Sequence, residues 1–172
     1  CFIVFPIIQE SDKIDAEDAE TAYYNFKDNI FSDYSLGFLH GKLKKEEKKE
    51  LMLKVNNGEI QCLVSTTVVE VGIDNPNATI MVVENSERFG LTQLHQLRGR
   101  VGRGGYQSFC FLIQRKKSEN SIKRLKIIED NLDGFKISDE DLKLRGPGEF
   151  LGTKQHGYVP SKLVDIANDS EI

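Results

Sequence analysis

Short, almost wholly apolar runs alternate along this chain with segments of helical periodicity. The runs cover residues 2–8, 60–64, 78–83 and 107–113, with a shorter strand candidate at 34–39. Strands that are apolar throughout are typical of parallel sheets, which are buried on both faces and connected by helices. Residues 15–31 and 44–56 have the pattern of such connecting helices, and Asn57-Gly58 closes the second. The sequence therefore predicts an α/β fold: a parallel sheet with helices on both faces.

The composition is that of a soluble globular chain, with 172 residues, 39% hydrophobic and 29% charged. No apolar run approaches the roughly 18 residues of a membrane span, so we expect no membrane partner. The opening Cys1-Phe2-Ile3-Val4-Phe5 has neither a methionine nor a basic leader, and we expect it to be a strand of a longer protein. The three cysteines form no C-x-x-C pair, which indicates buried thiols and a cytoplasmic location.

The formal charge of −4 conceals a strong asymmetry along the chain. Residues 88–126 contain ten basic residues and one acid, a sum of +9, so the remainder carries −13. Such a basic block is a candidate site for a polyanion, although by itself it is more often a solvated face.

Residues 65–74 follow an apolar run and read Ser-Thr-Thr-Val-Val-Glu-Val-Gly-Ile-Asp. Hydroxyl groups at the end of a parallel strand can donate to a phosphate oxygen, and Gly72 permits close backbone approach. The carboxylate of Asp74 could accept from a ribose hydroxyl. A polar turn between two buried strands explains the same residues, so this segment alone favours that simpler interpretation.

Residues 93–104 combine arginines with glycines. If the segment is helical, Arg100 and Arg103 lie three residues apart and point the same way. Two guanidinium groups on one face suit the charge that develops on a γ-phosphate during its transfer. A basic surface helix explains the arginines but not Gly99, Gly102 and Gly104, each of which costs a helix about 1 kcal/mol relative to alanine.

No G-x-x-x-x-G-K-[ST] phosphate loop and no Rossmann fingerprint are present in the sequence. No paired acids follow a buried run to hold magnesium. His40, His95 and His156 lack metal-ligand spacing, so we expect no metal site. The chain could complete a nucleotide site but could not form one alone.

The character of the chain changes after residue 113. Residues 118–131 have the pattern of an amphipathic helix, with Ile122, Leu125 and Ile128 on one side. Ser138 and the acids after it predict the start of another helix. We expect a helical appendage there, and a last helix from residue 161.

These motifs, in this order, resemble the second RecA-like lobe of superfamily-two helicases. Gln96-x-x-Gly99-Arg100-x-x-Arg103 is similar to the arginine-finger motif of that superfamily, and Thr66-Thr67 through Gly72-x-Asp74 resembles the motif before it. His40-Gly41 resembles an earlier motif of the same lobe, which binds a nucleic-acid strand. Residues 66–104 and the tail LKLRGPGEFLGTKQHG at 142–157 narrow the resemblance to the bacterial branched-DNA helicase family RecG.

The resemblance assigns a role to each candidate residue. Arg100 and Arg103 would be catalytic fingers that reach ATP held by another lobe, with Gln96, Gly72 and Asp74 lining the nucleotide. His40, Gly41, Thr66 and Thr67 would bind DNA. Arg124, Arg145, Glu149 and Gln155 would couple lobe movement to translocation.

The resemblance also implies a division of the chain and a set of partners. Residues 1–114 would be the helicase lobe, 115–160 the translocation element, and 161–172 the start of a C-terminal helix. The whole protein would use ATP and Mg²⁺, both held mainly by an N-terminal lobe, to act on branched double-stranded DNA in repair and recombination. A wedge domain would be a further partner, and the location would be the bacterial cytoplasm with the nucleoid. The 172 residues alone would be inactive.

Two alternatives stay open from the sequence. The first is the translocase lobe of the transcription-repair coupling factor, which shares the translocation element. The second is a non-catalytic module that uses the basic block to bind nucleic acid.

Overall fold

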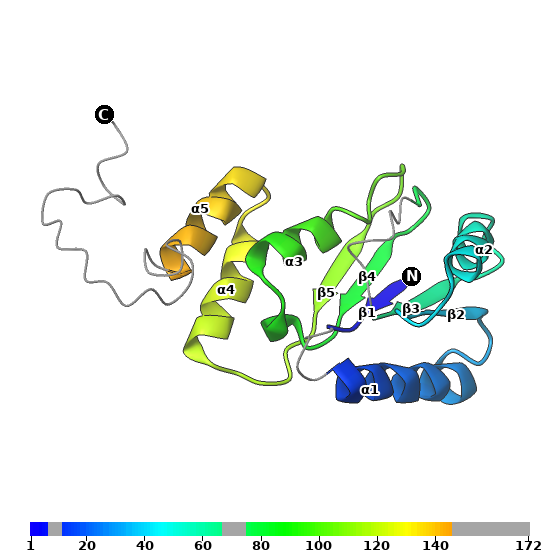
Figure 1. The fold of residues 1–172 in the computed structure, drawn as a ribbon. Coiled ribbons are helices and arrows are strands. Elements are labelled where there is room, and N and C mark those ends of the chain that lie inside the picture. Colours follow the sequence, from blue (N-terminus) through cyan, green and yellow to red (C-terminus); the bar gives the residue numbers. More distant parts are fainter. Residues whose placement is uncertain (7–11, 67–74, 146–172) are drawn as a thin grey trace, which may run out of the picture.

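The computed structural model describes residues 1–6, 12–66 and 75–145 of the chain (Figure 1). The elements follow one another as β1 (Phe2–Val4), α1 (Asp12–Asn25), the π-helical turn η1 (Phe26–Ile30), β2 (Leu36–Leu39), α2 (Lys45–Asn56), β3 (Cys62–Ser65), β4 (Ile80–Val83), the 3₁₀ turn η2 (Ser86–Arg88), α3 (Leu91–Arg98), β5 (Phe109–Leu112), α4 (Glu119–Asp130) and α5 (Gly134–Arg145). Among these helices, none has the length and apolar character needed to cross a membrane.

The strands form one sheet in the order β2-β3-β1-β4-β5, and every neighbouring pair is parallel. All carboxyl ends therefore meet at one edge of the sheet, and all amino ends at the other. The predicted parallel α/β fold is confirmed.

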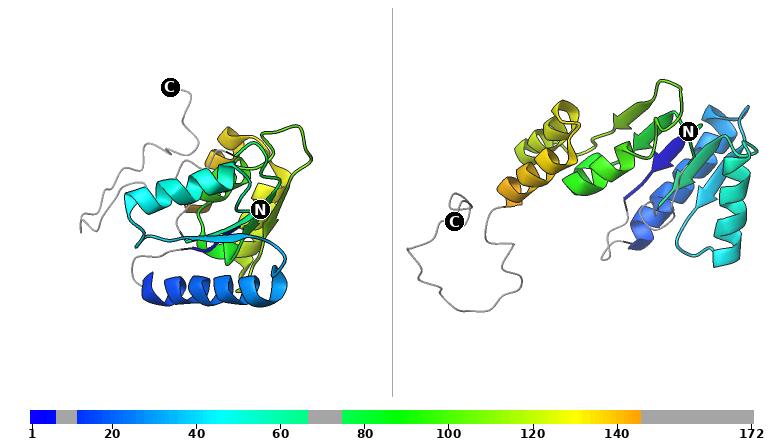
Figure 2. Two further views of the ribbon diagram at one scale, coloured as in Figure 1. Left: turned by 90° about the vertical axis from the view of Figure 1, so that its right-hand side faces the viewer. Right: turned by 90° about the horizontal axis from the view of Figure 1, so that it is seen from above.

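Each face of the sheet packs against different helices (Figure 2). On one face, Ile3 and Val64 form a cluster with Tyr23 of α1 and Phe26 of η1. On the other face, the alternate strand residues Phe2, Val4, Leu39, Leu63, Met81 and Val83 pack with side chains of α2 and α3. The continuous apolar runs of the sequence arise because most strand residues are buried on one face or the other.

The hairpin of α4 and α5 shares the core of the sheet. Ile128 of α4 and Ile137 of α5 are 2% and 0% exposed and belong to the same cluster as Leu91, Leu94 and Leu97 of α3. The predicted helix over residues 118–131 is confirmed, with Ser118 as its N-cap.

The second helix of the hairpin starts earlier than the sequence predicts. Ser138 lies inside α5, which begins at Gly134. The Asp133 carboxylate accepts a hydrogen bond from the Phe135 N–H at 2.9 Å, and the Asp133 carbonyl accepts from the Ile137 N–H at 3.1 Å. Asp133 therefore has the capping role that the sequence analysis gave to Ser138.

Candidate functional site

The carboxyl edge of the sheet brings His40, Gly41 and Thr66 together. His40 and Gly41 follow β2, and Thr66 follows β3, the neighbour of β2 in the sheet. The Thr66 N–H donates to the Leu39 carbonyl at 3.1 Å, which joins the two strand ends. A Cβ atom on Gly41 would meet no atom within 4 Å, so a ligand can approach the backbone there.

The Thr66 side chain is buried in an unusual way. The residue is 4% exposed, and its Oγ1 finds no hydrogen-bond partner among the described residues. A buried hydroxyl without a partner costs roughly 1–3 kcal/mol.

Several lysines and the N-terminus of α2 lie beside this edge, together with Glu46 and Glu47 in the first turn of that helix. The N-terminus of α2 begins five residues after His40, and the segment between them contains the exposed Lys42 and Lys44. Lys48 donates to the Gly41 carbonyl at 3.5 Å. Helix N-termini and lysines both attract anions, so this edge suits phosphate groups. These lysines were not among the predicted site residues, although several lysines follow His40-Gly41 closely in the sequence.

The finger candidates lie at the opposite, amino edge. The Gly102 N–H donates to the Ala78 carbonyl at 3.3 Å, just before β4 begins. Arg103 is exposed and donates from Nε to the Gly99 carbonyl at 2.9 Å, while Arg100 is half-buried. Gln96 is exposed on the last turns of α3.

Arg100 and Arg103 do not lie on a helix. The helix α3 ends at Arg98 with Gly99 as its C-cap, so the helical spacing considered for the two arginines is wrong. Gly102 has a φ of +78°, a left-handed conformation that favours glycine and prevents the segment after α3 from continuing as a helix. Arg100 and Arg103 therefore lie in a turn, which the hydrogen bond from Gly102 to Ala78 connects to the start of β4.

Two of the glycines in this turn have a packing reason. A Cβ on Gly102 would lie 2.3 Å from Ser108 Oγ, and one on Gly104 would lie 2.3 Å from the Pro76 carbonyl oxygen. Gly99 has no contact closer than 3.5 Å. Tight packing therefore accounts for Gly102 and Gly104, which a basic surface helix left unexplained.

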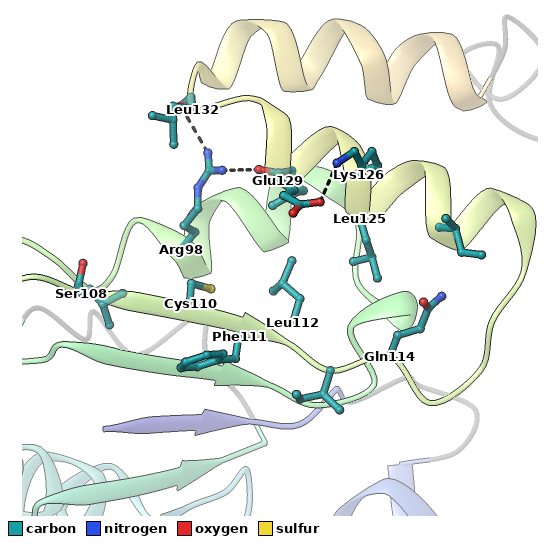
Figure 3. A pocket seen from close by; sticks show the side chains of 14 residues that line it. Arg98, Ser108, Cys110, Phe111, Leu112, Gln114, Leu125, Lys126, Glu129 and Leu132 are labelled. Atoms are coloured by element: carbon teal, nitrogen blue, oxygen red, sulfur yellow. Dashed lines mark hydrogen bonds and ion pairs between the residues drawn. The ribbon is translucent and has the colours of Figure 1, made fainter.

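Arg98 is a structural residue that sequence reasoning missed (Figure 3). Its guanidinium donates to the carbonyls of Ile128 at 2.5 Å, Asn131 at 2.8 Å and Leu132 at 3.4 Å, and lies 3.0 Å from His95 Nδ1. It thereby satisfies carbonyls at the C-terminal end of α4, where a positive charge is also favourable. The helix that precedes the finger candidates thus holds one end of the hairpin.

Arg124 makes a second connection of the same kind. Its guanidinium donates to the Glu87 carbonyl at 3.5 Å and to the Phe89 carbonyl, both in the segment between β4 and α3. Of the other coupling candidates, Arg145 ends α5. Glu149 and Gln155, like Thr67, Gly72 and Asp74, lie outside the described residues.

A groove of about 680 Å³ runs between β5 and α4 (Figure 3). Its walls are largely apolar, with Leu112 on one side and Leu125 on the other, and Arg98 at one end. Burial raises the pKa of the Cys110 thiol to about 11, and the charge of Arg98 acts in the opposite direction. The thiol is therefore protonated at neutral pH and is no nucleophile.

Within residues 1–6, 12–66 and 75–145, no group of three or more His, Cys, Asp or Glu side chains could hold a metal ion.

The chain matches two family models. Residues 3–105 match the helicase conserved C-terminal domain, and residues 131–172 match the C-terminal part of domain 3 of the ATP-dependent DNA helicase RecG. The first match covers more than half of the chain.

Individual relatives agree with these models. The chain is 51% identical over 171 residues to the ATP-dependent DNA helicase RecG of Thermotoga maritima and 49% identical to that of Synechocystis sp.. These alignments cover 99% of this chain but only 22% and 21% of the relatives, so the chain spans about a fifth of their length.

A solved structure of RecG bound to a three-way DNA junction is similar, with a TM-score of 0.70 and 50% identity, over 87% of this chain and 19% of that one. The resemblance inferred from the motifs is confirmed: the chain belongs to the family of helicase conserved C-terminal domains, and its relatives within that family are ATP-dependent DNA helicases named RecG.

Proposed function

We propose that this chain is the second motor lobe of an ATP-dependent translocase that moves on double-stranded DNA and acts on branched DNA, such as stalled forks and Holliday junctions. One observation carries the proposal. The finger candidates and the phosphate-suited residues occupy opposite edges of one sheet, and the hairpin is attached to the helix that precedes the fingers. The likeness to a RecG bound to a three-way junction supports branched DNA as the substrate.

The amino edge would face the nucleotide. The exposed Arg103 and the half-buried Arg100 suit the negative charge of phosphate oxygens, so the residues present fit ATP held by a neighbouring lobe. Gln96, Gly72 and Asp74 would line the same nucleotide. ATP supplies the free energy of the reaction, and Mg²⁺ would be held mainly by the other lobe.

The carboxyl edge would face DNA. Thr66 and Thr67 would donate to DNA phosphates, and the backbone at His40 and Gly41 would approach the same strand. The lysines around the start of α2 would add a sequence-independent attraction to the phosphates.

The hairpin would be part of a translocation element over residues 115–160, distinct from the helicase lobe at 1–114, with a further helix from 161. Arg124 and Arg98 bind the hairpin to the lobe, which supports a coupling role. Arg145, Glu149 and Gln155 would complete this coupling. The other partners would be an N-terminal helicase lobe and a wedge domain of the full-length protein. The protein would act in the bacterial cytoplasm, at the nucleoid.

The test is Arg103→Ala in the full-length protein, with ATP turnover measured on branched DNA. An arginine finger contributes roughly 10³ to 10⁵ in rate, so we expect kcat to fall by about 10³-fold or more with little change in KM for ATP.

Arg115→Ala is the matched control. It removes a charge from the same basic segment, but Arg115 pairs with Glu84 at the carboxyl edge, away from the proposed nucleotide site. At saturating DNA, the kcat of this variant should therefore stay near that of the parent protein. An Arg103→Ala protein that keeps its kcat would contradict the proposal and favour a non-catalytic binding module.

A further inference from the structure

The guanidinium of Arg98 uses all of its terminal N–H groups. Each of the two terminal nitrogens of an arginine carries two N–H groups. In Arg98, one of them donates to the carbonyls of Ile128 and Asn131, at 2.5 and 2.8 Å. The other donates to the Leu132 carbonyl at 3.4 Å (Figure 3) and lies 3.0 Å from Nδ1 of His95. Three of these contacts go to the hairpin, and the last returns to α3, the helix that carries Arg98 itself.

The contact with Arg98 determines which nitrogen of the His95 ring carries the proton. A guanidinium group has donors and no acceptor, so Nδ1 of the imidazole must accept. An imidazole whose Nδ1 accepts is neutral and carries its proton on Nε2. An imidazolium would instead place an N–H group and a positive charge against the guanidinium. His95 is therefore the neutral Nε2–H tautomer.

The other side of the His95 ring packs against the start of α5. A Cβ atom on Gly134 would lie 2.8 Å from Nε2 of His95, 3.4 Å from Cδ2 and 3.6 Å from Cε1. Gly134 is the first residue of α5, and a side chain there would collide with the ring. The half-buried imidazole thus lies between the Arg98 guanidinium and the hairpin.

The Arg98 side chain needs such a support because it is long and has many rotamers. The three carbonyls fix its guanidinium to the end of the hairpin helix α4, but they do not fix it to α3. His95 lies one turn before Arg98 on α3, at the i, i+3 spacing at which side chains of a helix meet. Its Nδ1 holds the guanidinium to α3 as well, so that a movement of α3 carries the guanidinium and the hairpin with it.

We propose that His95 is a positioning residue of the translocase, which orients the Arg98 guanidinium and so completes the polar connection between α3 and the hairpin. This connection lies beside the apolar core that α3, α4 and α5 share. The inference rests on the proposed function. It gives a role to a residue that the sequence analysis considered only as a metal ligand and rejected.

The experiment compares His95→Leu and His95→Asn in the full-length protein, by the duplex unwound per ATP hydrolysed on branched DNA. Leucine has no acceptor, so we expect this ratio to fall by about fivefold, as for the loss of one hydrogen bond to a charged group. Asparagine places a carbonyl oxygen near the position of Nδ1 and should recover at least about half of the parent ratio. ATP turnover should change by less than about twofold in both variants. Circular dichroism confirms that the proteins are folded.

A double mutant separates positioning from a merely structural role. If His95 acts through Arg98, adding His95→Leu to Arg98→Ala should cause no further loss, because the contact is already absent. Losses that multiply would overturn the proposal, since His95 would then act independently of Arg98. Thr92→Ala is the matched control: Thr92 is an exposed residue of the same helix, and this variant should keep the parent ratio.

The tautomer of His95 is a second readout, and it does not depend on activity. Full-length protein labelled with ¹⁵N in its histidine rings gives ring correlations by NMR, and comparison with His95→Asn assigns those of His95. At mildly alkaline pH we expect a neutral ring with its proton on Nε2, and a proton on Nδ1 or on both nitrogens would overturn the proposal. A parent protein that unwinds no branched DNA would overturn the proposed function as well. Multiplying losses in a parent that does unwind would overturn the role of His95 alone.

Discussion

At the scale of single residues, Thr66 places a polar group in a buried position at the end of β3. Its hydroxyl is buried and has no hydrogen-bond partner among the described residues, yet it follows a strand at the edge assigned to DNA. Stability and function therefore make opposite demands on this side chain.

Replacing Thr66 with valine tests this conflict. Thr66→Val removes the hydroxyl and keeps the shape, so the free energy of unfolding should stay the same or rise by about 1 kcal/mol. DNA affinity of the full-length protein should fall by about tenfold, the equivalent of one lost hydrogen bond to a charged group. Chemical denaturation and a DNA-binding titration measure the two quantities.

Thr66→Ser is the control, because it keeps the hydroxyl and should keep most of the affinity. A Thr66→Val protein that is clearly destabilised and binds DNA normally would show that the hydroxyl is structural.

Residues differ in how far the sequence could predict them. Thr66 was found because polar residues that follow buried runs gather at one edge of a parallel sheet, whereas His40 was found through the resemblance of His40-Gly41 to a motif of the helicase superfamily. The role of Arg98 was not predicted, because its partners Ile128, Asn131 and Leu132 lie 30 or more positions further along the chain. Only tertiary packing brings these residues together. The turn at Gly102 was missed because Arg100 and Arg103 were placed on a helix by their spacing.

At the scale of elements, the hairpin depends on a close contact between α5 and α3. A Cβ on Gly134 would lie 2.8 Å from His95 Nε2, a distance that forces one of the two to move. His95 is itself 3.0 Å from the Arg98 guanidinium. The helix α5 begins at Gly134, four residues before Ser138, and Asp133 caps it. Helix propensity alone does not predict this start, because glycine is unfavourable in a helix.

Gly134→Ala should therefore loosen the hairpin. Overpacking a close contact costs about 1–3 kcal/mol, and we expect the free energy of unfolding to fall by that amount.

Gly105→Ala is the matched control, because a Cβ there meets no atom within 4 Å, and it should be neutral or slightly stabilising. Thermal unfolding of both proteins checks the difference; equal melting temperatures would show that the contact at His95 relaxes without cost.

At the scale of the whole molecule, the sheet separates two surfaces and the hairpin connects to one of them. The four-residue strands hold the amino and carboxyl edges about 13 Å apart. Arg98 lies between the finger candidates and the hairpin, since its backbone ends α3 and its guanidinium holds the end of α4. A displacement of the arginine turn would thus reach the hairpin through the Arg98 side chain, in addition to the apolar core that α3 shares with α4 and α5.

Arg98→Ala should uncouple the motor. In the full-length protein we expect duplex unwinding per ATP to fall by about tenfold or more, because hydrogen bonds from a charged group contribute roughly 1.5–3 kcal/mol each. ATP turnover should change much less. Parallel assays of unwinding and hydrolysis measure the ratio.

Arg98→Lys keeps the charge but lacks the planar fork that serves several carbonyls, so its effect should be intermediate. If hydrolysis and unwinding fall in proportion, Arg98 supports catalysis or folding and is no coupling residue.

The basic segment 88–126 has a different meaning once its contacts are known. Of its ten positive side chains, Arg98 and Arg124 donate to backbone carbonyls, and Arg115 and Lys126 pair with acids. DNA binding displaces condensed cations from the phosphates, about 0.9 per contact on duplex DNA. Were this segment to bind DNA, as the alternative of a non-catalytic module supposes, it would displace fewer counterions than its charge implies, because part of that charge binds the hairpin to the lobe. Added salt would then weaken DNA binding more than the arginine contacts to the hairpin, which are partly buried.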